Sequence, residues 1–115
     1  MRTMLVVDDE IDCCDAFKNY FTKRGWEVHV AYDGREAEGL LKGMQYEYIF
    51  FDCNMPELSG VELVEVIKQY NPSAKKIMVS GYNLVNEDFA KNLGVDQFLV
   101  KPVSLEEAER ITQNG

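Results

Sequence analysis

The segment that decides the fold is residues 48–54, YIFFDCN, in which a run of apolar side chains ends on Asp52. Such a continuous apolar run is typical of a strand that is buried on both faces of a parallel sheet. An aspartate directly after the run falls at the carboxyl end of the strand, which is the edge where open parallel sheets bind their ligands. Asp52 is therefore the first candidate for a functional residue.

Similar short apolar runs recur on both sides of this segment. They are residues 4–7 (MLVV), 28–31 (VHVA), 77–80 (IMVS) and 98–100 (FLV). Each run has the length of a strand. The run at 28–31 alternates more between apolar and polar side chains, which favours a position nearer the edge of the sheet.

Helical patterns fill the intervals between the runs. In the first interval Ile11, Cys14, Phe17 and Phe21 recur at helical spacing, so they are expected to share a buried face, with Gly25 as the stop. Capping boxes predict two further helix starts, one at Asp33 with Glu36 and one at Ser104 with Glu107. Helical patterns also cover residues 56–70 and, more weakly, residues 85–93.

Strand and helix patterns alternate strictly, which predicts an α/β protein with helices on both faces of a parallel sheet. Right-handed crossovers leave few topologies for five strands, and the commonest at this length is the flavodoxin-like one. We therefore expect one domain over residues 1–115, with a doubly wound (βα)5 parallel sheet in the strand order 2-1-3-4-5.

The composition limits the classes of function. The formal net charge of −8 disfavours direct nucleic-acid binding, because an acidic surface repels phosphate backbones. No apolar run approaches the roughly 20 residues that a membrane span needs, and no signal-peptide pattern opens the chain. The three cysteines form no CxxC pair and are expected to be free thiols. These features predict a cytoplasmic protein that does not contact a membrane.

Polar residues stand where the predicted strands end. They are Asp8 and Asp9 after the first strand, Asp52 after the third, Ser80 at the end of the fourth and Lys101 after the fifth. Singly, such residues are more often turn or cap residues, but together they should meet at one edge of the sheet. Clustered carboxylates without soft partners suit Mg²⁺ or Mn²⁺, and a carboxylate such as Asp52 can attack phosphorus. A hydroxyl and an ammonium group can stabilise the phosphoryl oxygens.

Four segments carry a family resemblance. The strings LVVDDE (5–10), FDCNMPELSG (51–60), IMVSGY (77–82) and FLVKPV (98–103) are similar to those of bacterial response-regulator receiver domains, and the similarity covers the whole chain. The resemblance implies that Asp52 is the phosphoacceptor. It also implies a Mg²⁺ site with Asp9 and Asp52 as direct ligands. Asp8 would act through water, and the backbone carbonyl of Asn54 would be a further ligand.

The same resemblance assigns roles around the acceptor. Ser80 stands at the family's Thr or Ser position and Lys101 at its lysine, both beside the phosphoryl group. Phe98 stands at the position of the family's switch aromatic, so Ser80 and Phe98 would form the switch. Tyr82 would lie at the rim of the site and shield the phosphoryl group from water. The Lys101–Pro102 peptide bond is expected to be cis.

The resemblance further implies partners. A histidine kinase or a phosphotransfer protein would donate the phosphoryl group. The output would pass to a downstream effector in trans, or to an output domain outside these residues, through the face formed by the fourth helix, fifth strand and fifth helix. The same face would serve a phosphorylation-dependent dimer. The chain would catalyse only its own phosphorylation and dephosphorylation, so it is not expected to be an enzyme in the ordinary sense.

Other classes of function stay as alternatives. A phosphatase of the haloacid dehalogenase type also uses an aspartate nucleophile with Mg²⁺, but it needs a second aspartate two positions later, where this chain has Asn54. A receiver that works without phosphorylation usually lacks the acidic pair, the acceptor or the lysine, and this chain has them all. Nucleotide binding is disfavoured because neither a GxGxxG nor a P-loop motif occurs. His29 is interpreted as a packed or surface residue and not as a phosphodonor.

Overall fold

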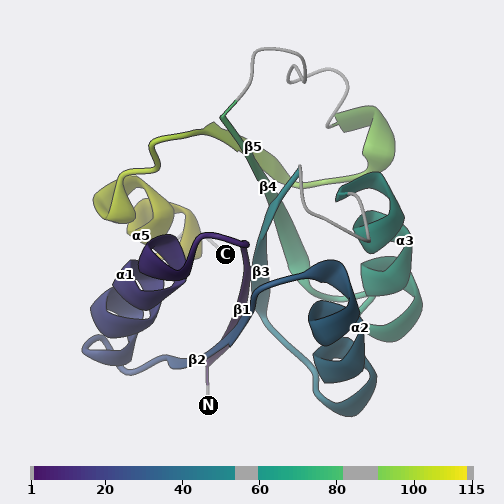
Figure 1. Cartoon of the computed structure of the whole chain (residues 1–115), viewed down its shortest axis with the longest axis horizontal. Coiled ribbons are helices and arrows are strands. Elements are labelled where there is room, and N and C mark those ends of the chain that lie inside the picture. The colour runs from purple at the N-terminus through teal and green to yellow at the C-terminus, as the bar shows by residue number, and fades with distance from the viewer. Residues whose placement is uncertain (1, 54–59, 82–90, 114–115) are drawn as a thin grey trace.

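The structure is a computed structural model that describes residues 2–53, 60–81 and 91–113 (Figure 1). The elements follow in the order β1 (Thr3–Val7), α1 (Ile11–Thr22), β2 (Glu27–Ala31), α2 (Gly34–Gly43), β3 (Tyr48–Asp52), α3 (Gly60–Tyr70), β4 (Lys75–Ser80), β5 (Gln97–Val100) and α5 (Leu105–Gln113). Residues 91–93 are also helical, whereas residues 85–90 of the helix expected there lie outside the described residues. No helix in the described part is long and apolar enough to cross a membrane.

The strands form one five-stranded sheet in the order β2-β1-β3-β4-β5, and every neighbouring pair is parallel. This result confirms the flavodoxin-like topology, and β2 lies at an edge as its alternating pattern indicated. In the register, Val7 lies opposite Phe51, and Asp52 lies opposite Val79. The strands therefore end at nearly the same level, and the residues that follow them meet along one edge.

Helices enclose the sheet from both sides. α1 and α5 cover one face, while α2 and α3 cover the other (Figure 1). Phe17, Phe21 and Phe50 pack together in the core on the α1 side. Leu63 and Ile67 are fully buried in the core on the α3 side. Burial of each such side chain contributes about 1.5–3 kcal/mol, so these two cores hold the sheet, and with it the side chains at its edge, in fixed positions.

Side-chain caps begin α2 and α5 at the predicted residues. The Asp33 carboxylate accepts a hydrogen bond from the Glu36 N–H at 2.8 Å, and the Ser104 hydroxyl accepts one from the Glu107 N–H at 3.3 Å. These bonds satisfy backbone donors that have no partner within the first helical turn. In both capping boxes, the hydrogen bond to the N-cap side chain is therefore confirmed.

The start of α1 differs from the expectation. Cys14, Phe17 and Phe21 are buried, but Ile11 is 59% exposed. Ile11 is the first residue of the helix, and it is not among the residues that form or pack against the core on the α1 side. Gly25, which follows the helix, has φ of +89°, a left-handed conformation that glycine adopts without strain.

A buried asparagine joins the second helical layer to the sheet. The Asn71 amide nitrogen donates hydrogen bonds to the carbonyls of Leu41 at 3.1 Å and Met44 at 3.0 Å. The amide oxygen of Asn71 accepts a hydrogen bond from the Tyr46 N–H at 2.7 Å. The residue after α3 is thus fixed against the end of α2 and the start of β3.

Trp26 marks the amino end of the sheet, opposite the edge where the strands finish. It is buried, and the Arg2 guanidinium lies over its ring at 4.0 Å. Arg2 also donates a hydrogen bond to the carbonyl of Thr112 at 2.8 Å. These contacts tie the end of α5 to the first strand, so Trp26 reports on the packing of both termini of the described chain.

Candidate functional site

The carboxyl edge of the sheet brings together polar residues that the sequence singled out. Asp8 follows β1, Asp52 ends β3, Ser80 ends β4 and Lys101 follows β5. Asp8, Asp52 and Ser80 are buried. The Lys101 N–H donates a hydrogen bond to the Ser80 carbonyl at 2.9 Å, which continues the pairing of β4 with β5 into the site. The predicted cis peptide bond between Lys101 and Pro102 is also present.

The ammonium group of Lys101 lies at the centre of this site. Its Nζ is 3.0 Å from an Asp8 oxygen, 2.9 Å from an Asp52 oxygen and 2.8 Å from a Glu10 oxygen. Burial lowers the pKa of Lys101, but its hydrogen bonds to Glu10 and to the two aspartates outweigh that effect and hold the pKa above its ordinary range. Lys101 is therefore a permanent positive charge among carboxylates at neutral pH.

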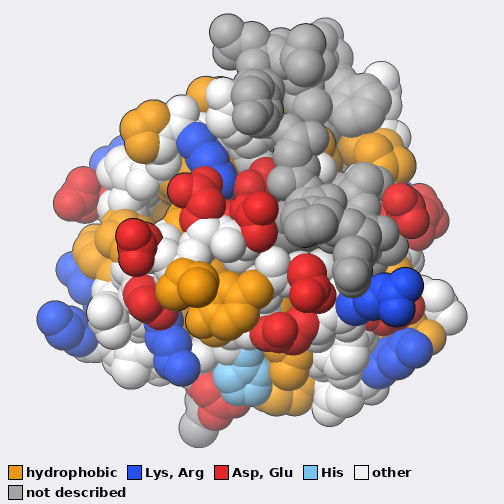
Figure 2. Space-filling model, viewed as in Figure 1, with side chains coloured by type: hydrophobic (Ala, Val, Ile, Leu, Met, Phe, Trp, Pro, Cys, Tyr) orange, Lys and Arg blue, Asp and Glu red, His pale blue; other side chains and the backbone are white. Residues whose placement is uncertain are grey.

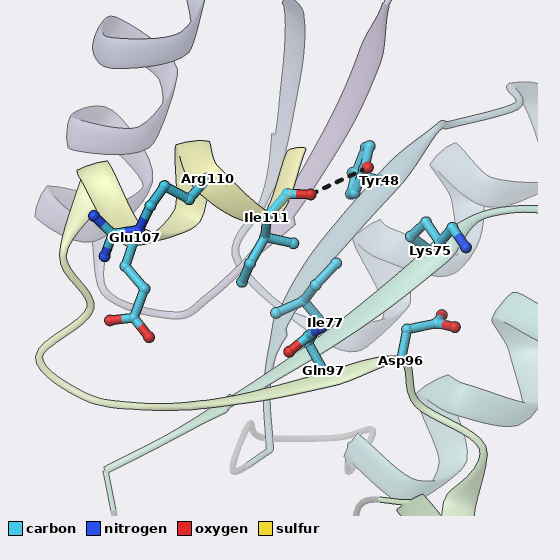
Figure 3. A pocket seen from close by; sticks show the side chains of 8 residues that line it. All are labelled: Tyr48, Lys75, Ile77, Asp96, Gln97, Glu107, Arg110 and Ile111. Atoms are coloured by element: carbon cyan, nitrogen blue, oxygen red, sulfur yellow. Dashed lines mark hydrogen bonds between the residues drawn. The ribbon is translucent and has the colours of Figure 1, made fainter. Parts of the chain in front are cut away.

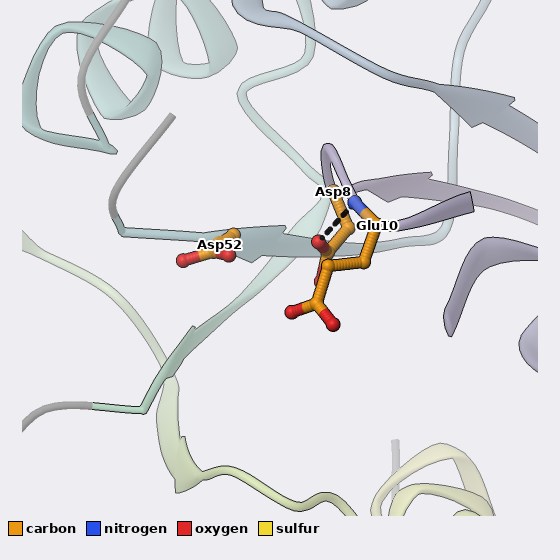
Figure 4. A group of neighbouring side chains, drawn as sticks. All are labelled: Asp8, Glu10 and Asp52. Carbon is orange, nitrogen blue, oxygen red and sulfur yellow. Dashed lines mark hydrogen bonds between the residues drawn. The ribbon is translucent and has the colours of Figure 1, made fainter. Parts of the chain in front are cut away.

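Three carboxylates stand close enough to share a cation. Oxygen atoms of Asp8, Glu10 and Asp52 all lie within 4.8 Å of one another (Figure 4). The Glu10 N–H donates a hydrogen bond to Asp8 Oδ1 at 2.9 Å, which fixes the backbone that follows β1. Because the donors in this group are all hard carboxylate oxygens, they fit Mg²⁺ better than a softer metal.

Asp9 does not belong to this carboxylate group, and its side chain is exposed. Partial desolvation of this exposed side chain nevertheless raises the pKa of Asp9, and the charges of Asp8 and Asp52 raise it further. Asp9 therefore lies in the same negative field, which a bound cation would relieve. The backbone carbonyl predicted as a further ligand belongs to Asn54, which lies outside the described residues.

The two predicted switch residues lie on neighbouring strands. Ser80 is fully buried, and its register partner on β5 is Val100. Phe98 is partly buried and packs against the core on the α2 and α3 side of the sheet. Phe98 is thus in an intermediate position, neither fully exposed to solvent nor closed into the core. Tyr82, the predicted rim residue, lies outside the described residues.

The cysteines near the site are protonated thiols at neutral pH. Burial, followed by the charge of Asp8, raises the pKa of Cys13 to about 11 and that of Cys14 to about 12. Burial and the charge of Asp52 raise the pKa of Cys53 as well. All three cysteines are free, as predicted. None of them offers a thiolate that would compete with Asp52 as a nucleophile.

His29 lies in the middle of β2 and makes local contacts. Its Nδ1 shares a hydrogen bond with the Tyr46 hydroxyl at 2.8 Å, and its Nε2 lies 3.1 Å from a Glu27 carboxylate oxygen. Burial, followed by the charge of Glu27, raises the pKa of Tyr46 to about 12. These contacts fit the interpretation of His29 as a packed surface residue.

A cavity of about 510 Å³ opens directly beside the acidic site. Its lining includes Glu10, Cys13 and Phe17 from the α1 side and Lys101 and Pro102 from the loop after β5. The ends of the Glu10 and Lys101 side chains therefore border open space, in contrast to the buried aspartates.

A second cavity, of about 500 Å³, lies at the amino ends of β3, β4 and β5, beneath α5 (Figure 3). Its lining carries Lys75 and Arg110 together with Asp96 and Glu107, so the charges are mixed. It lies at the opposite end of the strands from Asp52. The acidic edge is therefore the stronger candidate for the functional site.

Acidic side chains are spread over the face shown in Figure 2, and a group of them gathers beside a basic side chain. This distribution agrees with the formal net charge of −8.

Glu10 is the site residue that was not singled out from the sequence. Its one sequence signal is its place as the third consecutive acidic residue after the first strand. Its contact with Lys101 joins positions 91 residues apart, which no local pattern reveals.

Comparison with known proteins agrees with this fold and site. The sequence model of the response regulator receiver domain matches residues 4–113. The chain therefore belongs to the response regulator receiver domain family of two-component systems. Response regulator SaeR of Staphylococcus epidermidis is 31% identical over 115 residues, covering 99% of this chain and 50% of the relative. Regulatory protein AtoC of Escherichia coli is 27% identical over 116 residues, covering 100% of this chain and 25% of the relative. The chain thus spans half or less of the length of these relatives.

Solved structures show the same fold. A CheY-like receiver domain protein from Methanospirillum hungatei superposes with a TM-score of 0.90 at 32% identity, covering 99% of this chain and 93% of the other. Response regulator TrrA from Thermotoga maritima, in complex with Mg²⁺ and BeF, superposes with a TM-score of 0.86 at 27% identity, covering 99% and 98%. These likenesses extend over nearly the whole chain.

Proposed function

We propose that this receiver domain takes a phosphoryl group on Asp52 in a Mg²⁺-dependent reaction and transmits the signal by changing a partner-binding surface. The observation that carries the proposal is the position of the Asp52 carboxylate, which is 8% exposed, ends β3 and lies 2.9 Å from Lys101 Nζ. The complex of TrrA with Mg²⁺ and BeF supports the proposal, because BeF can stand in for a phosphoryl group on a carboxylate.

The donor that fits is a phosphohistidine on a histidine kinase or a phosphotransfer protein. A carboxylate oxygen of Asp52 forms the new bond to phosphorus, while the bond between phosphorus and the donor's imidazole nitrogen breaks. The imidazole keeps the electron pair and takes up a proton. Lys101 balances negative charge on the phosphoryl oxygens, and the Ser80 hydroxyl donates to one of them.

Mg²⁺ is the cation that the carboxylate group fits. Asp8 and Asp52 come from that group, and the family resemblance adds Asp9 and the Asn54 carbonyl as proposed ligands. When bound, the ion would supply positive charge to the carboxylates and to the phosphoryl oxygens. Its loss would leave Lys101 as the main positive charge at the edge.

The domain acts, in this proposal, only on its own aspartate, which it phosphorylates and dephosphorylates. Its output passes to an effector in trans or to an output domain, and both arrangements are compatible with a chain that spans half or less of its relatives. A phosphorylation-dependent dimer through the face of the expected fourth helix, β5 and α5 is a further form of output. The cytoplasmic location remains a prediction from the sequence.

Intact-mass spectrometry after incubation with acetyl phosphate and Mg²⁺ tests the proposal. We expect one phosphoryl adduct on the wild type and none on Asp52→Asn, which is nearly isosteric but lacks the nucleophilic oxygen. An adduct of equal yield on Asp52→Asn would place the acceptor elsewhere. Steady hydrolysis of unrelated phosphomonoesters would instead favour a phosphatase of the haloacid dehalogenase type.

The switch part of the proposal has its own test. A phosphoryl group on Asp52 would draw the Ser80 hydroxyl inward, and the partly buried Phe98 ring would then move further into the space behind β4. Completing the burial of such a ring contributes up to about 1.5–3 kcal/mol, enough to bias two states without locking one. Dimerisation and partner binding are compared with and without beryllofluoride. If Ser80→Ala and Phe98→Ala respond as the wild type does, the coupling of these residues is wrong.

A further inference from the structure

Glu10 occupies a helix-cap position without capping the helix. It is the N-cap residue of α1, yet its side chain makes no cap hydrogen bond. Serine, threonine, aspartate and asparagine are the residues whose side chains form the cap hydrogen bond at such a position, so capping does not account for a glutamate here. Its carboxylate instead reaches across the site and lies 2.8 Å from Lys101 Nζ.

The three carboxylates around Lys101 differ in their surroundings. The side chains of Asp8 and Asp52 are 5% and 8% exposed, whereas that of Glu10 is 65% exposed. All three belong to the group that could share a cation, but the family resemblance names Asp8 and Asp52, and not Glu10, among the residues that would hold Mg²⁺. Asp52 also gives up an oxygen to the phosphoryl group. Among the three, only Glu10 has a carboxylate that neither the proposed cation binding nor the phosphorylation of Asp52 requires.

Resting on the proposed phosphorylation of Asp52, we propose that Glu10 is a positioning residue that holds the Lys101 ammonium over the site while Asp52 carries the phosphoryl group. Lysine has a long stem and loses much rotamer freedom when it is held in one place. The cavity beside the Glu10–Lys101 pair gives the ammonium room to swing away from Asp52. The Glu10 carboxylate limits that movement, so that Lys101 remains available to the phosphoryl oxygens.

The sign of the effect separates this role from a simple charge effect. A negative charge beside an anion repels it, so removal of the Glu10 charge would by itself tighten the binding of a phosphoryl analogue. A positioning role predicts the opposite, because the ammonium that binds the analogue becomes less well placed. Partly exposed ion pairs contribute up to about 1 kcal/mol, so we expect affinity to fall about three- to fivefold.

The probe is beryllofluoride at saturating Mg²⁺, followed by fluorine NMR on the whole chain, so that changes in Mg²⁺ affinity do not enter the result. Glu10→Gln should bind beryllofluoride about three- to fivefold more weakly than the wild type. Glu10→Asp, which keeps the charge but shortens the reach, should also bind more weakly. In a Lys101→Met background, Glu10→Gln should cause no further loss, because the effect acts through Lys101. Urea unfolding of each variant confirms that it is folded.

Two results would overturn the role of Glu10 and leave Asp52 as acceptor. One is that Glu10→Gln binds beryllofluoride as tightly as the wild type or more tightly. The other is that Glu10→Gln lowers the affinity for beryllofluoride equally in the wild-type and Lys101→Met backgrounds. If the wild type binds no beryllofluoride, or if Asp52→Asn binds it as well as the wild type does, the proposed function is overturned, and this inference falls with it.

Discussion

Replacing Lys101 with methionine would remove the positive charge that three carboxylates share. Methionine keeps most of the length and apolar surface of the lysine stem, so the main change is electrostatic. Lys101 Nζ lies 3.0 Å from Asp8 and 2.9 Å from Asp52, and both aspartate side chains are less than one-tenth exposed. Removing one partner of a buried ion pair costs roughly 3–5 kcal/mol, and because the Lys101 side chain is itself 19% exposed we expect the lower end, about 3 kcal/mol.

The free energy of unfolding is measured by urea titration in the presence of a chelator. Trp26, the single tryptophan, is buried at the amino end of the sheet and reports unfolding at a distance from the altered site. Lys18→Met, at an exposed position of α1, is the matched control because it makes the same change in net charge. A loss of about 3 kcal/mol corresponds to a fall in Tm of roughly 10 °C for a domain of this size.

Mg²⁺ provides the second half of this experiment. A divalent cation can replace the missing positive charge, so Mg²⁺ should stabilise Lys101→Met more than it stabilises the wild type. The electrostatic role of Lys101 is refuted if the free energies of unfolding of Lys101→Met and Lys18→Met differ by less than the roughly 1 kcal/mol of an exposed ion pair. It is also refuted if Mg²⁺ stabilises the variant no more than the wild type.

Three further predictions concern stability. Asp9→Asn should raise the Tm in chelator, because the raised pKa of Asp9 means that its charge is unfavourable in the folded state. The gain in Tm should vanish as the pH falls below the ordinary pKa of an aspartate, where Asp9 is protonated in both states. A lower Tm for the variant would contradict this prediction. The raised pKa of Tyr46 means that its neutral hydroxyl stabilises the folded state. This contribution to the free energy of unfolding is complete below pH 10 and is lost as the pH rises toward about 12, by up to about 1.4 kcal/mol per pH unit. Tyr46→Phe should therefore show a weaker decline in urea midpoint above about pH 10, and a parallel decline would argue against the assignment. Asn71→Ala should lower the free energy of unfolding in urea by roughly 3 kcal/mol, since the three hydrogen bonds of Asn71 contribute about 1 kcal/mol each. A loss no larger than that of a substitution at an exposed position would show that these bonds do not stabilise the fold.

The fold could be predicted from the sequence because its signals are local. Continuous apolar runs such as residues 48–51 showed which strands are buried on both faces, and the capping pairs at Asp33 and Ser104 marked helix starts. The parallel topology then placed Asp8, Asp52 and Lys101 at one edge without any knowledge of side-chain contacts. The structure confirms that placement.

Side-chain direction at the edge could not be predicted in the same way. Ile11 has the spacing of a core residue, but it is the first residue of α1 and is exposed. Glu10 and Asp9 are neighbours in the sequence, yet the structure places the carboxylate of Glu10, and not that of Asp9, in the group around Lys101. Such choices depend on loop geometry and on contacts across the whole chain, which periodicity does not report.

Locating the modification in the chain decides whether Asp52 accepts the phosphoryl group. The protein is incubated with acetyl phosphate and Mg²⁺ and then treated with borohydride, which reduces an aspartyl phosphate to homoserine, and the position is read by peptide mass spectrometry. We expect homoserine at position 52 and at no other aspartate, and only when Mg²⁺ is present. Homoserine at Asp8 or Asp9, or an unmodified Asp52 in a sample that carries a phosphoryl adduct, would contradict it.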